Sequence, residues 1–332
     1  MSDATGIQWT DSTWNVVTGC TRVSPGCARC YIERTPPFRM QHRRFATVDA
    51  ASTTGVTLHW ERLDKPPRGP KVFTPSLGDL FHEDVPDEFV AAVFDSMRLH
   101  PDRQFQVLTK RPQRAAELLP ELYDYAGRFE INDYAHDGQP LPNVWLGVSI
   151  ENARYTWRAD VLREIPAAVR FISAEPLLGS LFPDIRLHPQ RAKIMRALAD
   201  GLTARETAQL FGIAPSTVRW HAKESRSRPL DLTGIDWVII GGESGPSARP
   251  FHLEHARELL DHCGACDPYD GRDRPAIFVK QLGAKPIIRH PYIAGVADAY
   301  SGLELHDRKG GDIDEWPADL RIREFPRTAV PT

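Results

Sequence analysis

Three of the five cysteines of this 332-residue chain lie within eleven positions, in the stretch TGCTRVSPGCARCYIE (18–33). Cys20, Cys27 and Cys30 are spaced as C-x6-C-x2-C. Thiolates bind both zinc and iron–sulfur clusters, so this spacing predicts a metal centre without choosing the metal. A closed structural zinc site requires four protein ligands. Whether the chain supplies a fourth ligand therefore separates the two kinds of centre.

The composition fits a protein of the reducing cytoplasm. The formal net charge is −3, and no stretch approaches the roughly 18–20 consecutive apolar residues that cross a bilayer. The first residues, MSDATGIQWTDSTWN, lack the basic start and the apolar run of a secretory signal peptide. We therefore expect a cytoplasmic protein without membrane contacts. In that compartment, clustered cysteines indicate metal binding or catalysis more than disulfides.

Six segments share one pattern, a short apolar or β-branched run that ends in polar or glycine residues. Runs of this kind are typical of parallel strands that are buried on both faces. Helix-like stretches lie between them, such as DEFVAAVFDSMRLH (87–100), whose apolar residues recur at helical spacing. This alternation predicts an α/β fold with a parallel sheet. The six segments are 71–79, 105–111, 143–151, 169–176, 236–244 and 276–283.

Polar residues after the strands favour a full or partial TIM-like (β/α) barrel over an open sheet. In a barrel the carboxyl ends of all strands converge on one face, where active sites of this architecture lie. An open doubly wound sheet concentrates its site at one switch point. If STWNVVTGC (12–20) is the first strand, the loop that carries the cysteines, which we call the cysteine loop (residues 19–31), lies on the same face. The polar residues that follow the strands include Asp79, Lys110, Arg111, Ser149, Glu151, Ser173, Glu175, Glu243, Lys280 and Gln281.

The two remaining cysteines are candidates for a fourth zinc ligand, but the predicted fold separates them from the first three. Cys263 and Cys266 lie at the end of the helix-like stretch 252–263, which would place them at the opposite end of a barrel. A strand of five or six residues separates these ends by about 17–20 Å. His82 or His42 is an alternative fourth ligand, so zinc stays open.

A three-cysteine loop after the first strand of a partial barrel resembles the site of radical S-adenosylmethionine (SAM) enzymes. In those enzymes the cysteines hold a [4Fe–4S] cluster whose open iron binds the amino and carboxylate groups of SAM. Reduction then cleaves SAM to an adenosyl radical. Their usual spacing is C-x3-C-x2-C, so here the second interval agrees and the first is three residues longer. The resemblance implies a [4Fe–4S] cluster on Cys20, Cys27 and Cys30, with SAM as cofactor and a separate, unidentified electron donor.

The same resemblance implies contacts to the amine and ribose of SAM after the segments 71–79 and 143–151. The Gly-Gly-Glu at 241–243 resembles the motif that binds the SAM amine, although it follows a later strand than in that superfamily. Its glycines would also let a ligand approach the backbone closely. The cofactor-binding candidates are Ser76, Asp79, Ser149, Glu151, Gly241 and Gly242.

Charged residues at the barrel mouth are the candidates for catalysis. Glu175 and Glu243 could hold SAM, or transfer a proton from a raised pKa in a partly dry site. Lys110, together with Arg111, could bind a phosphate or a carboxylate group. The alternative is that these charges pair with one another inside the mouth. We name Glu243, Glu175 and Lys110 as catalytic candidates.

Residues 188–229 interrupt the strand–helix pattern with a basic segment, which contains eight Lys and Arg against three Asp and Glu. Its stretch LADGLTARETAQLFGIAPSTVRWHAK resembles a helix-turn-helix of the LuxR type. Thr203 and Glu206 would form a capping box, and Gly212 would close a short helix. The segment either contacts DNA or is a helical insertion whose basic face is solvated. The DNA-binding candidates are Ser216, Thr217, Arg219, Trp220 and Lys223.

Many blocks outside this insertion resemble the phage-borne three-cysteine-motif proteins, a family of uncharacterised activity. They include SLGDLFHEDVPDEF, NVWLGVSIEN, RFISAEPLLG and GIDWVIIGGESGPSARP. The resemblance implies a radical-SAM-like barrel with a C-terminal tail over 1–187 and 230–332, interrupted by the insertion at 188–229. It also implies a nucleic acid, or a nucleotide precursor, as the substrate, and the insertion favours DNA. We therefore expect an iron–sulfur enzyme that the insertion docks on DNA; the alternative is a zinc-stabilised DNA-binding regulator without catalysis.

Overall fold

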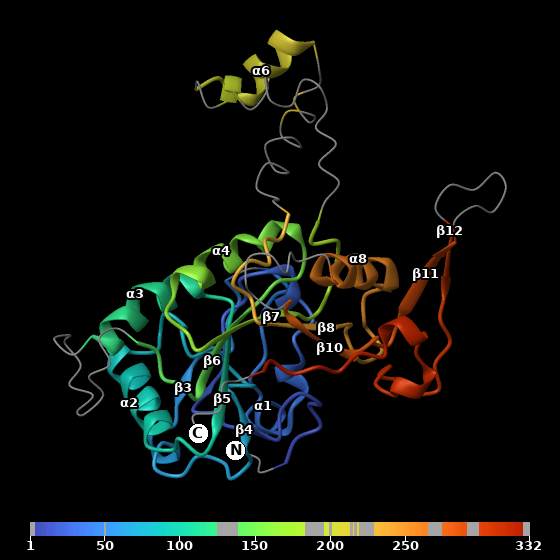
Figure 1. Cartoon of the computed structure of the whole chain (residues 1–332). Coiled ribbons are helices and arrows are strands. Elements are labelled where there is room, and N and C mark those ends of the chain that lie inside the picture. The colour runs from blue at the N-terminus through green and yellow to red at the C-terminus, as the bar shows by residue number, and fades with distance from the viewer. Residues whose placement is uncertain are drawn as a thin grey trace.

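The centre of the structure is one sheet of seven parallel strands (Figure 1). The strands stand side by side in the order of the chain, and every neighbouring pair is parallel. The structure is a computed structural model that describes residues 4–49, 51–124, 139–182, 196–198, 201–212, 215, 218, 229–264, 274–290 and 299–327. The strands of the sheet are β1 (Ser12–Thr13), β4 (Lys71–Thr74), β5 (Gln104–Thr109), β6 (Val144–Ser149), β7 (Val169–Ala174), β8 (Trp237–Gly241) and β10 (Ala276–Gln281).

The sequential strand order explains why the sheet curls. Connections between successive parallel strands are right-handed, so the helices within them lie on one side of the sheet and the strand twist accumulates in one direction. Figure 1 shows α2, α3 and α4 in a row along that side. The result is a mixed α/β fold with a curled half-barrel, whose edge strands are β1 and β10. The helices between and beside the strands include α2 (Asp87–Arg98), α3 (Pro112–Tyr123), α4 (Trp157–Glu164) and α8 (Leu253–Gly264).

The parallel sheet predicted from the sequence is confirmed. Each of the six predicted segments overlaps one strand of the seven-stranded sheet, and β5 begins one residue before its predicted segment. The predicted helix at 87–100 is α2, and the stretch 12–20 supplies β1 and then β2 (Val17–Thr18). The half-barrel agrees with the partial form of the predicted barrel.

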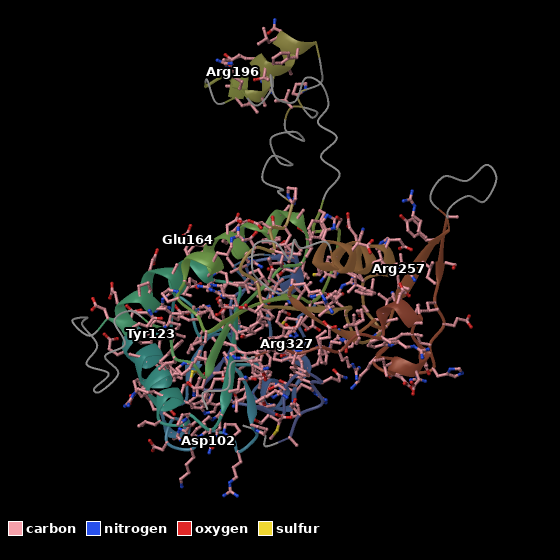
Figure 2. All side chains as sticks on the ribbon, viewed as in Figure 1. Asp102, Tyr123, Glu164, Arg196, Arg257 and Arg327 are labelled. Atoms are coloured by element: carbon pink, nitrogen blue, oxygen red, sulfur yellow. The ribbon has the colours of Figure 1, made fainter. Side chains whose placement is uncertain are left out.

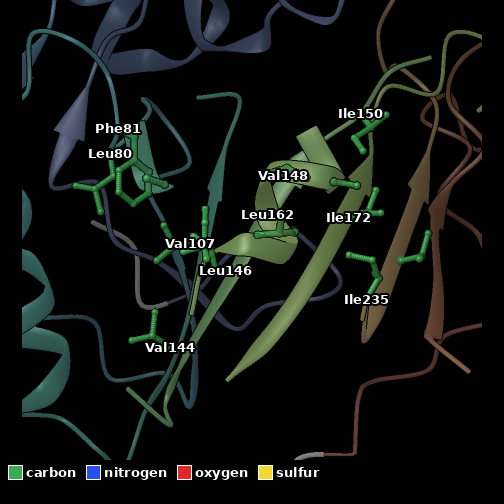
Figure 3. Close-up of a cluster of buried hydrophobic side chains, with 14 of the residues drawn as sticks. Leu80, Phe81, Val107, Val144, Leu146, Val148, Ile150, Leu162, Ile172 and Ile235 are labelled. Carbon is green, nitrogen blue, oxygen red and sulfur yellow. The ribbon is translucent and has the colours of Figure 1, made fainter. Parts of the chain in front are cut away.

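The outer face of the sheet packs against the helices. Side chains alternate between the two faces along each strand, so that Leu146 and Val148 of β6 and Ile172 of β7 point outward. Figure 3 shows these residues together with Leu162 of α4 in one buried cluster. This packing holds the strand ends, and the polar residues that follow them, on a rigid frame.

The inner face of the half-barrel is filled by aromatic side chains, which we call the aromatic floor. Trp9, Trp145 and Trp237 are at most 2% exposed. Trp237 lies edge-on to Trp145 and tilted against Phe171, with ring centroids 5.7 Å apart in both pairs. Trp145, Phe171 and Trp237 precede the polar residues at the ends of their own strands, so the floor lies beneath those residues.

Gly147 of β6 makes room for the aromatic floor. A Cβ at this position would overlap the ring of Phe171, whereas one at Gly302 would meet nothing within 4 Å. We expect Gly147→Ala to lower the free energy of unfolding by about 1–3 kcal/mol, because overpacking a filled interior has that effect. Urea unfolding followed by tryptophan fluorescence measures the change. Gly302→Ala is the control and should shift stability by less than about 0.5 kcal/mol; equal effects would contradict the packing described here.

The C-terminal segment covers the edge strand β10. The Val279 N–H donates to the Ile322 carbonyl at 2.8 Å, and the Glu324 N–H donates to the Ile277 carbonyl at 2.7 Å. These bonds shield the edge from pairing with another chain.

Within the described ranges, no helix has both the length and the apolar character needed to span a bilayer. The other elements are β3 (Thr57–Leu58), which pairs with β2; a small sheet of β9 (Phe251–His252), β11 (Pro286–His290) and β12 (Ala299–Gly302); the helix α1 (Pro36–Met40); and the 3-10 helices η1 (Pro25–Cys27), η2 (Tyr31–Arg34), η3 (Trp60–Arg62), η4 (Ala153–Tyr155), η6 (Ile313–Glu315) and η7 (Ala318–Leu320).

The helix α6 (Ala204–Phe211) belongs to the inserted segment and lies away from the sheet in Figure 1, as does Arg196 in Figure 2. The predicted capping box is confirmed, because Thr203 and Glu206 each accept the other's backbone N–H. Gly212 ends the helix in the left-handed conformation, with φ of 62°, as predicted. The DNA-binding candidates Ser216, Thr217, Arg219, Trp220 and Lys223 lie outside the described residues.

His255 of α8 gives the fold a dependence on pH. Burial, assisted by the nearby His252, lowers the pKa of His255 to about 4. The Nδ1 of His255 is buried without a hydrogen-bond partner among the described residues. Below pH 6.5 the unfolded chain takes up a proton at this residue, whereas the folded chain does so only near pH 4. Stability therefore falls as the pH drops between these two values.

Acidification from about pH 7 to about pH 4.5 lowers the free energy of unfolding, and we expect His255→Gln to make this decrease smaller by about 1–2 kcal/mol. The figure allows for the water that reaches the ring. Urea unfolding at about pH 7 and about pH 4.5 measures the decrease. The control is His306→Gln, because the His306 side chain is fully exposed. The prediction would be contradicted if acidification lowered the free energy of unfolding of His255→Gln as much as that of the control.

Candidate active site at the cysteine loop

The cysteine loop starts directly after β2 and runs beside the loop that follows β4. Gly19 and Gly78 form an isolated parallel bridge, and the Gly19 N–H donates to the Leu77 carbonyl at 2.8 Å. Gly19 has φ of 97°, and a Cβ there would overlap the carbonyl oxygen of Gly55. The loop is therefore held at the carboxyl end of the sheet, as the sequence predicts.

Residues 51–55 cover one side of the cysteine loop. The Cys20 N–H donates to the Thr54 hydroxyl at 3.1 Å, and the Thr54 N–H donates to the Cys20 carbonyl at the same distance. Thr21 and Thr53 form an antiparallel bridge. Cys20 is thus fixed on a short backbone ladder.

Positive side chains surround the three thiols. Nη1 of Arg111 lies 3.6 Å from Sγ of Cys20, and the Lys110 ammonium interacts with Cys27 and Cys30. Burial raises the pKa of Cys20 to about 12 and also raises the pKa of Cys30. In the metal-free protein these two thiols are therefore protonated at neutral pH. The neighbouring cations favour the thiolates that metal binding requires.

The donor types of the cysteine loop fit an iron–sulfur cluster, and they also fit zinc. Cys27 interacts electrostatically with both Cys20 and Cys30, so the three thiols lie near one another. Among the described residues, however, no group of three or more His, Cys, Asp or Glu side chains is arranged so that it could hold a metal ion. Binding through all three thiols therefore requires the loop to draw them together.

Of the four candidates for a fourth zinc ligand, the structure describes His82, His42 and Cys263, and Cys266 lies outside the described residues. His82 is fully buried; its Nε2 lies 2.8 Å from the Thr21 hydroxyl, and its Nδ1 accepts a backbone N–H at 3.0 Å. Both ring nitrogens are therefore occupied. His42 is exposed, and Cys263 is buried on α8.

Glu151, just after β6, is a fully buried anchor for the cysteine loop. One carboxylate oxygen accepts a hydrogen bond from the Ser24 hydroxyl and lies 3.7 Å from Nζ of Lys110. The other accepts a hydrogen bond of 3.1 Å from Arg158, which is itself 1% exposed. A Cβ on Gly26 would overlap the carboxylate. Glu151 therefore holds the middle of the loop, and a contact with SAM there would have to displace these bonds.

Three other cofactor candidates have structural partners or lie inside the half-barrel. Asp79 is buried and accepts hydrogen bonds from the Thr109 hydroxyl at 2.7 Å and from Arg111 at 3.1 Å. The Ser76 hydroxyl donates to a side-chain amide oxygen at 3.1 Å. Ser149 is 2% exposed on the inner face of β6. Asp79 and Ser76 thus fix the loop after β4, and a cofactor would compete with these bonds.

Glu175 and Lys280 form an ion pair across the mouth of the half-barrel, with 2.9 Å between Nζ and Oε1. Glu175 follows β7 and Lys280 lies on β10, so the pair spans the end of β8. A Cβ on Gly241 of β8 would lie 2.5 Å from the Glu175 carboxylate. Gly241 therefore makes room for this pair, which agrees with the alternative that charges at the mouth pair with one another.

Glu243, in the loop after β8, pairs with Arg249. Its carboxylate accepts the Arg249 backbone N–H at 2.9 Å and Nε–H at 3.0 Å. Burial acts to raise the pKa of Glu243, but the hydrogen bonds from Arg249 outweigh it and lower the pKa. This is the opposite of the raised pKa expected for proton transfer. Arg249 also donates to the Pro25 carbonyl at 2.9 Å, so the pair is hydrogen-bonded to the cysteine loop. The neighbouring Gly242 makes room for the backbone of Leu282, because a Cβ on Gly242 would lie 2.5 Å from the Leu282 carbonyl oxygen.

Two residues that organise the site were not identified from the sequence. Ser24 lies between the first two cysteines, and its hydroxyl meets a carboxylate 127 residues further along the chain. Arg158 lies on the buried face of α4, four residues before Leu162. A charged residue at a core-facing helical position was the signal that could have found Arg158, because a buried charge needs a partner.

The fold and site together define a parallel α/β half-barrel protein with three cysteines in a loop at the carboxyl end of its sheet. Residues 4–286 match the family described as "Protein of unknown function (DUF5131)", and the chain belongs to that family. The matched range contains the cysteine loop and all seven strands of the sheet. No curated protein and no solved structure matches the chain.

Proposed function

We propose that the chain is an iron–sulfur enzyme of the radical SAM type, in which Cys20, Cys27 and Cys30 bind a [4Fe–4S] cluster. The observation that carries this proposal is the three-cysteine loop at the carboxyl end of a sequentially ordered half-barrel. Active sites of barrels lie at that end. When bound, the cluster would supply one electron, obtained from a separate donor protein, that splits SAM into methionine and an adenosyl radical.

The chain's own residues set the conditions for this chemistry. Glu151 and Arg249 hold the cysteine loop over the strand ends. Burial acts to lower the pKa of Lys110, but the charges of Glu151 and Cys27 outweigh it and raise the pKa. Lys110 therefore stays charged beside the thiols and favours their ionised form. The buried aromatic floor closes the interior of the half-barrel beneath these residues.

The substrate we propose is a nucleic acid or a nucleotide precursor, with the inserted segment docking the enzyme on DNA. Support comes from α6, which has the capping box and the left-handed terminal glycine of a short, well-defined helix. The basic charge of residues 188–229 suits a phosphate backbone.

SAM cleavage tests the proposal. Protein reconstituted anaerobically with iron and sulfide would be reduced with dithionite in the presence of SAM, and the products analysed by mass spectrometry. We expect 5′-deoxyadenosine and methionine, and neither product from Cys27→Ser. Protein that holds its iron but cleaves no SAM would overturn the radical SAM class. Tightly bound zinc, with no iron, would instead favour a zinc-stabilised DNA-binding regulator.

A further inference from the structure

We infer that the mouth of the half-barrel carries a binding site for single-stranded DNA, formed by Arg29, Tyr31 and Arg34 against the turn 244–247. Guanidinium groups bind phosphates, and exposed aromatic rings stack on unpaired bases. The inference rests on the proposed function, because it names the form of the nucleic acid that the site receives.

The two arginines approach the same turn. Arg29 donates a hydrogen bond to the Ser247 carbonyl. Nη1 of Arg34 lies 2.9 Å from the position of a Cβ built on Gly245, which has φ of 96°. Ser244 and Ser247 are both exposed and carry hydroxyl donors. Two guanidinium groups and two hydroxyls therefore gather around one turn, which is a combination that suits a phosphodiester group.

Glu243, next to this turn, interacts electrostatically with Arg29, but hydrogen bonds from Arg249 already engage its carboxylate. The two exposed arginines therefore leave an excess of positive charge at the turn. The Arg34 side chain is exposed and forms no hydrogen bond or ion pair within the part of the chain that the structure describes. Arg29 is also exposed and makes no ion pair among those residues. By contrast, Arg111 and Arg249 of the same site are both paired with carboxylates. The surface at Arg29 and Arg34 is thus complementary to a polyanion.

Tyr31, which lies between the two arginines in the sequence, provides a stacking surface. Its side chain is 51% exposed, and its hydroxyl donates to the Ser76 carbonyl, which fixes the ring in place. A base inside a duplex does not offer its face to such a ring, so the occupant is a single strand. Tyr31 directly follows Cys30, and a stacked base would therefore lie beside the cysteine loop. We name DNA because it is also the polymer that the inserted segment is proposed to bind.

Fluorescence anisotropy with a labelled single-stranded oligonucleotide tests this inference in full-length, metal-free protein. We expect Tyr31→Ala to weaken binding about tenfold, since stacking one base contributes an effect of that order. Tyr31→Phe, which keeps the ring, should stay within about twofold of the wild type. Arg34→Gln should weaken binding and reduce the slope of log K against log salt concentration by about 0.7. Lys65→Gln is the control, because Lys65 is exposed in the segment before β4, at the opposite end of the sheet.

Several outcomes would overturn the inference. A weakening of duplex binding by Tyr31→Ala as large as its weakening of single-stranded binding, or tighter binding of RNA with the same sequence, would reject the single strand of DNA. Equal weakening by Lys65→Gln would show a non-specific charge effect. Equal weakening by Tyr31→Phe and Tyr31→Ala would assign Tyr31 to its bond with Ser76 rather than to stacking. If the wild-type protein cleaves SAM but does not bind single-stranded DNA, this inference alone is rejected. If it binds single-stranded DNA but holds no iron and cleaves no SAM, the proposed enzyme alone is rejected.

Discussion

Replacing Glu151 with alanine is expected to lower the free energy of unfolding by about 3–5 kcal/mol. The Glu151 carboxylate is fully buried against Arg158, which is 1% exposed, and also pairs with Lys110. The substitution removes the carboxylate and leaves a buried guanidinium group without a counter-charge, which is the costly way to break a buried pair. It also removes the acceptor of the Ser24 hydroxyl, so the cysteine loop loses its central attachment. Urea unfolding measures the change.

The matched control is Glu83→Ala, which removes a carboxylate that pairs with Arg111 but is 60% exposed. An exposed pair contributes less than about 1 kcal/mol. Glu151→Gln, which still accepts hydrogen bonds but carries no charge, should fall between the two. If Glu151→Ala were as mild as the control, Glu151 would not anchor the loop and would be free for the SAM contact predicted from the sequence.

Replacing Cys27 with serine is expected to reduce the iron content from about four atoms per chain to less than about one after anaerobic reconstitution. The serine hydroxyl is a hard, protonated oxygen and cannot replace a thiolate at neutral pH. Colorimetric iron and sulfide assays measure the loss.

Cys263→Ala is the control for this cysteine substitution, because Cys263 is buried on α8. It should keep its iron. Retention of a full complement of iron by Cys27→Ser, or an equal loss from Cys263→Ala, would contradict the assignment of the cysteine loop as the cluster site.

The parallel sheet could be predicted because its signal is local. Near-continuous apolar runs such as VWLGVS in β6 are buried on both faces, and this pattern distinguishes them from the helices between them. The opening of the half-barrel has no comparable signal. Whether β1 and β10 pair depends on strand twist accumulated over the whole sheet, and β1 is only two residues long.

The positions of the site residues were predictable, but their partners were not. The residues after the strands do meet at one end of the sheet, because parallel strands end together. Which charges pair depends on loop conformation: Arg249, six residues after Glu243, folds back onto it and lowers its pKa. Arg158 reaches Glu151 from a helix. For Glu151 and Asp79, partners within the protein occupy the oxygens that the resemblance to SAM enzymes assigned to a cofactor.

The electron paramagnetic resonance spectrum of the anaerobically purified, reduced protein, recorded with and without SAM, tests the central claim most directly. We predict about four irons per chain and a spectrum that SAM changes, because a cluster held by three cysteines leaves one iron open to SAM. A spectrum with no iron–sulfur signal after reconstitution, together with one tightly held zinc and no effect of SAM, would contradict the account.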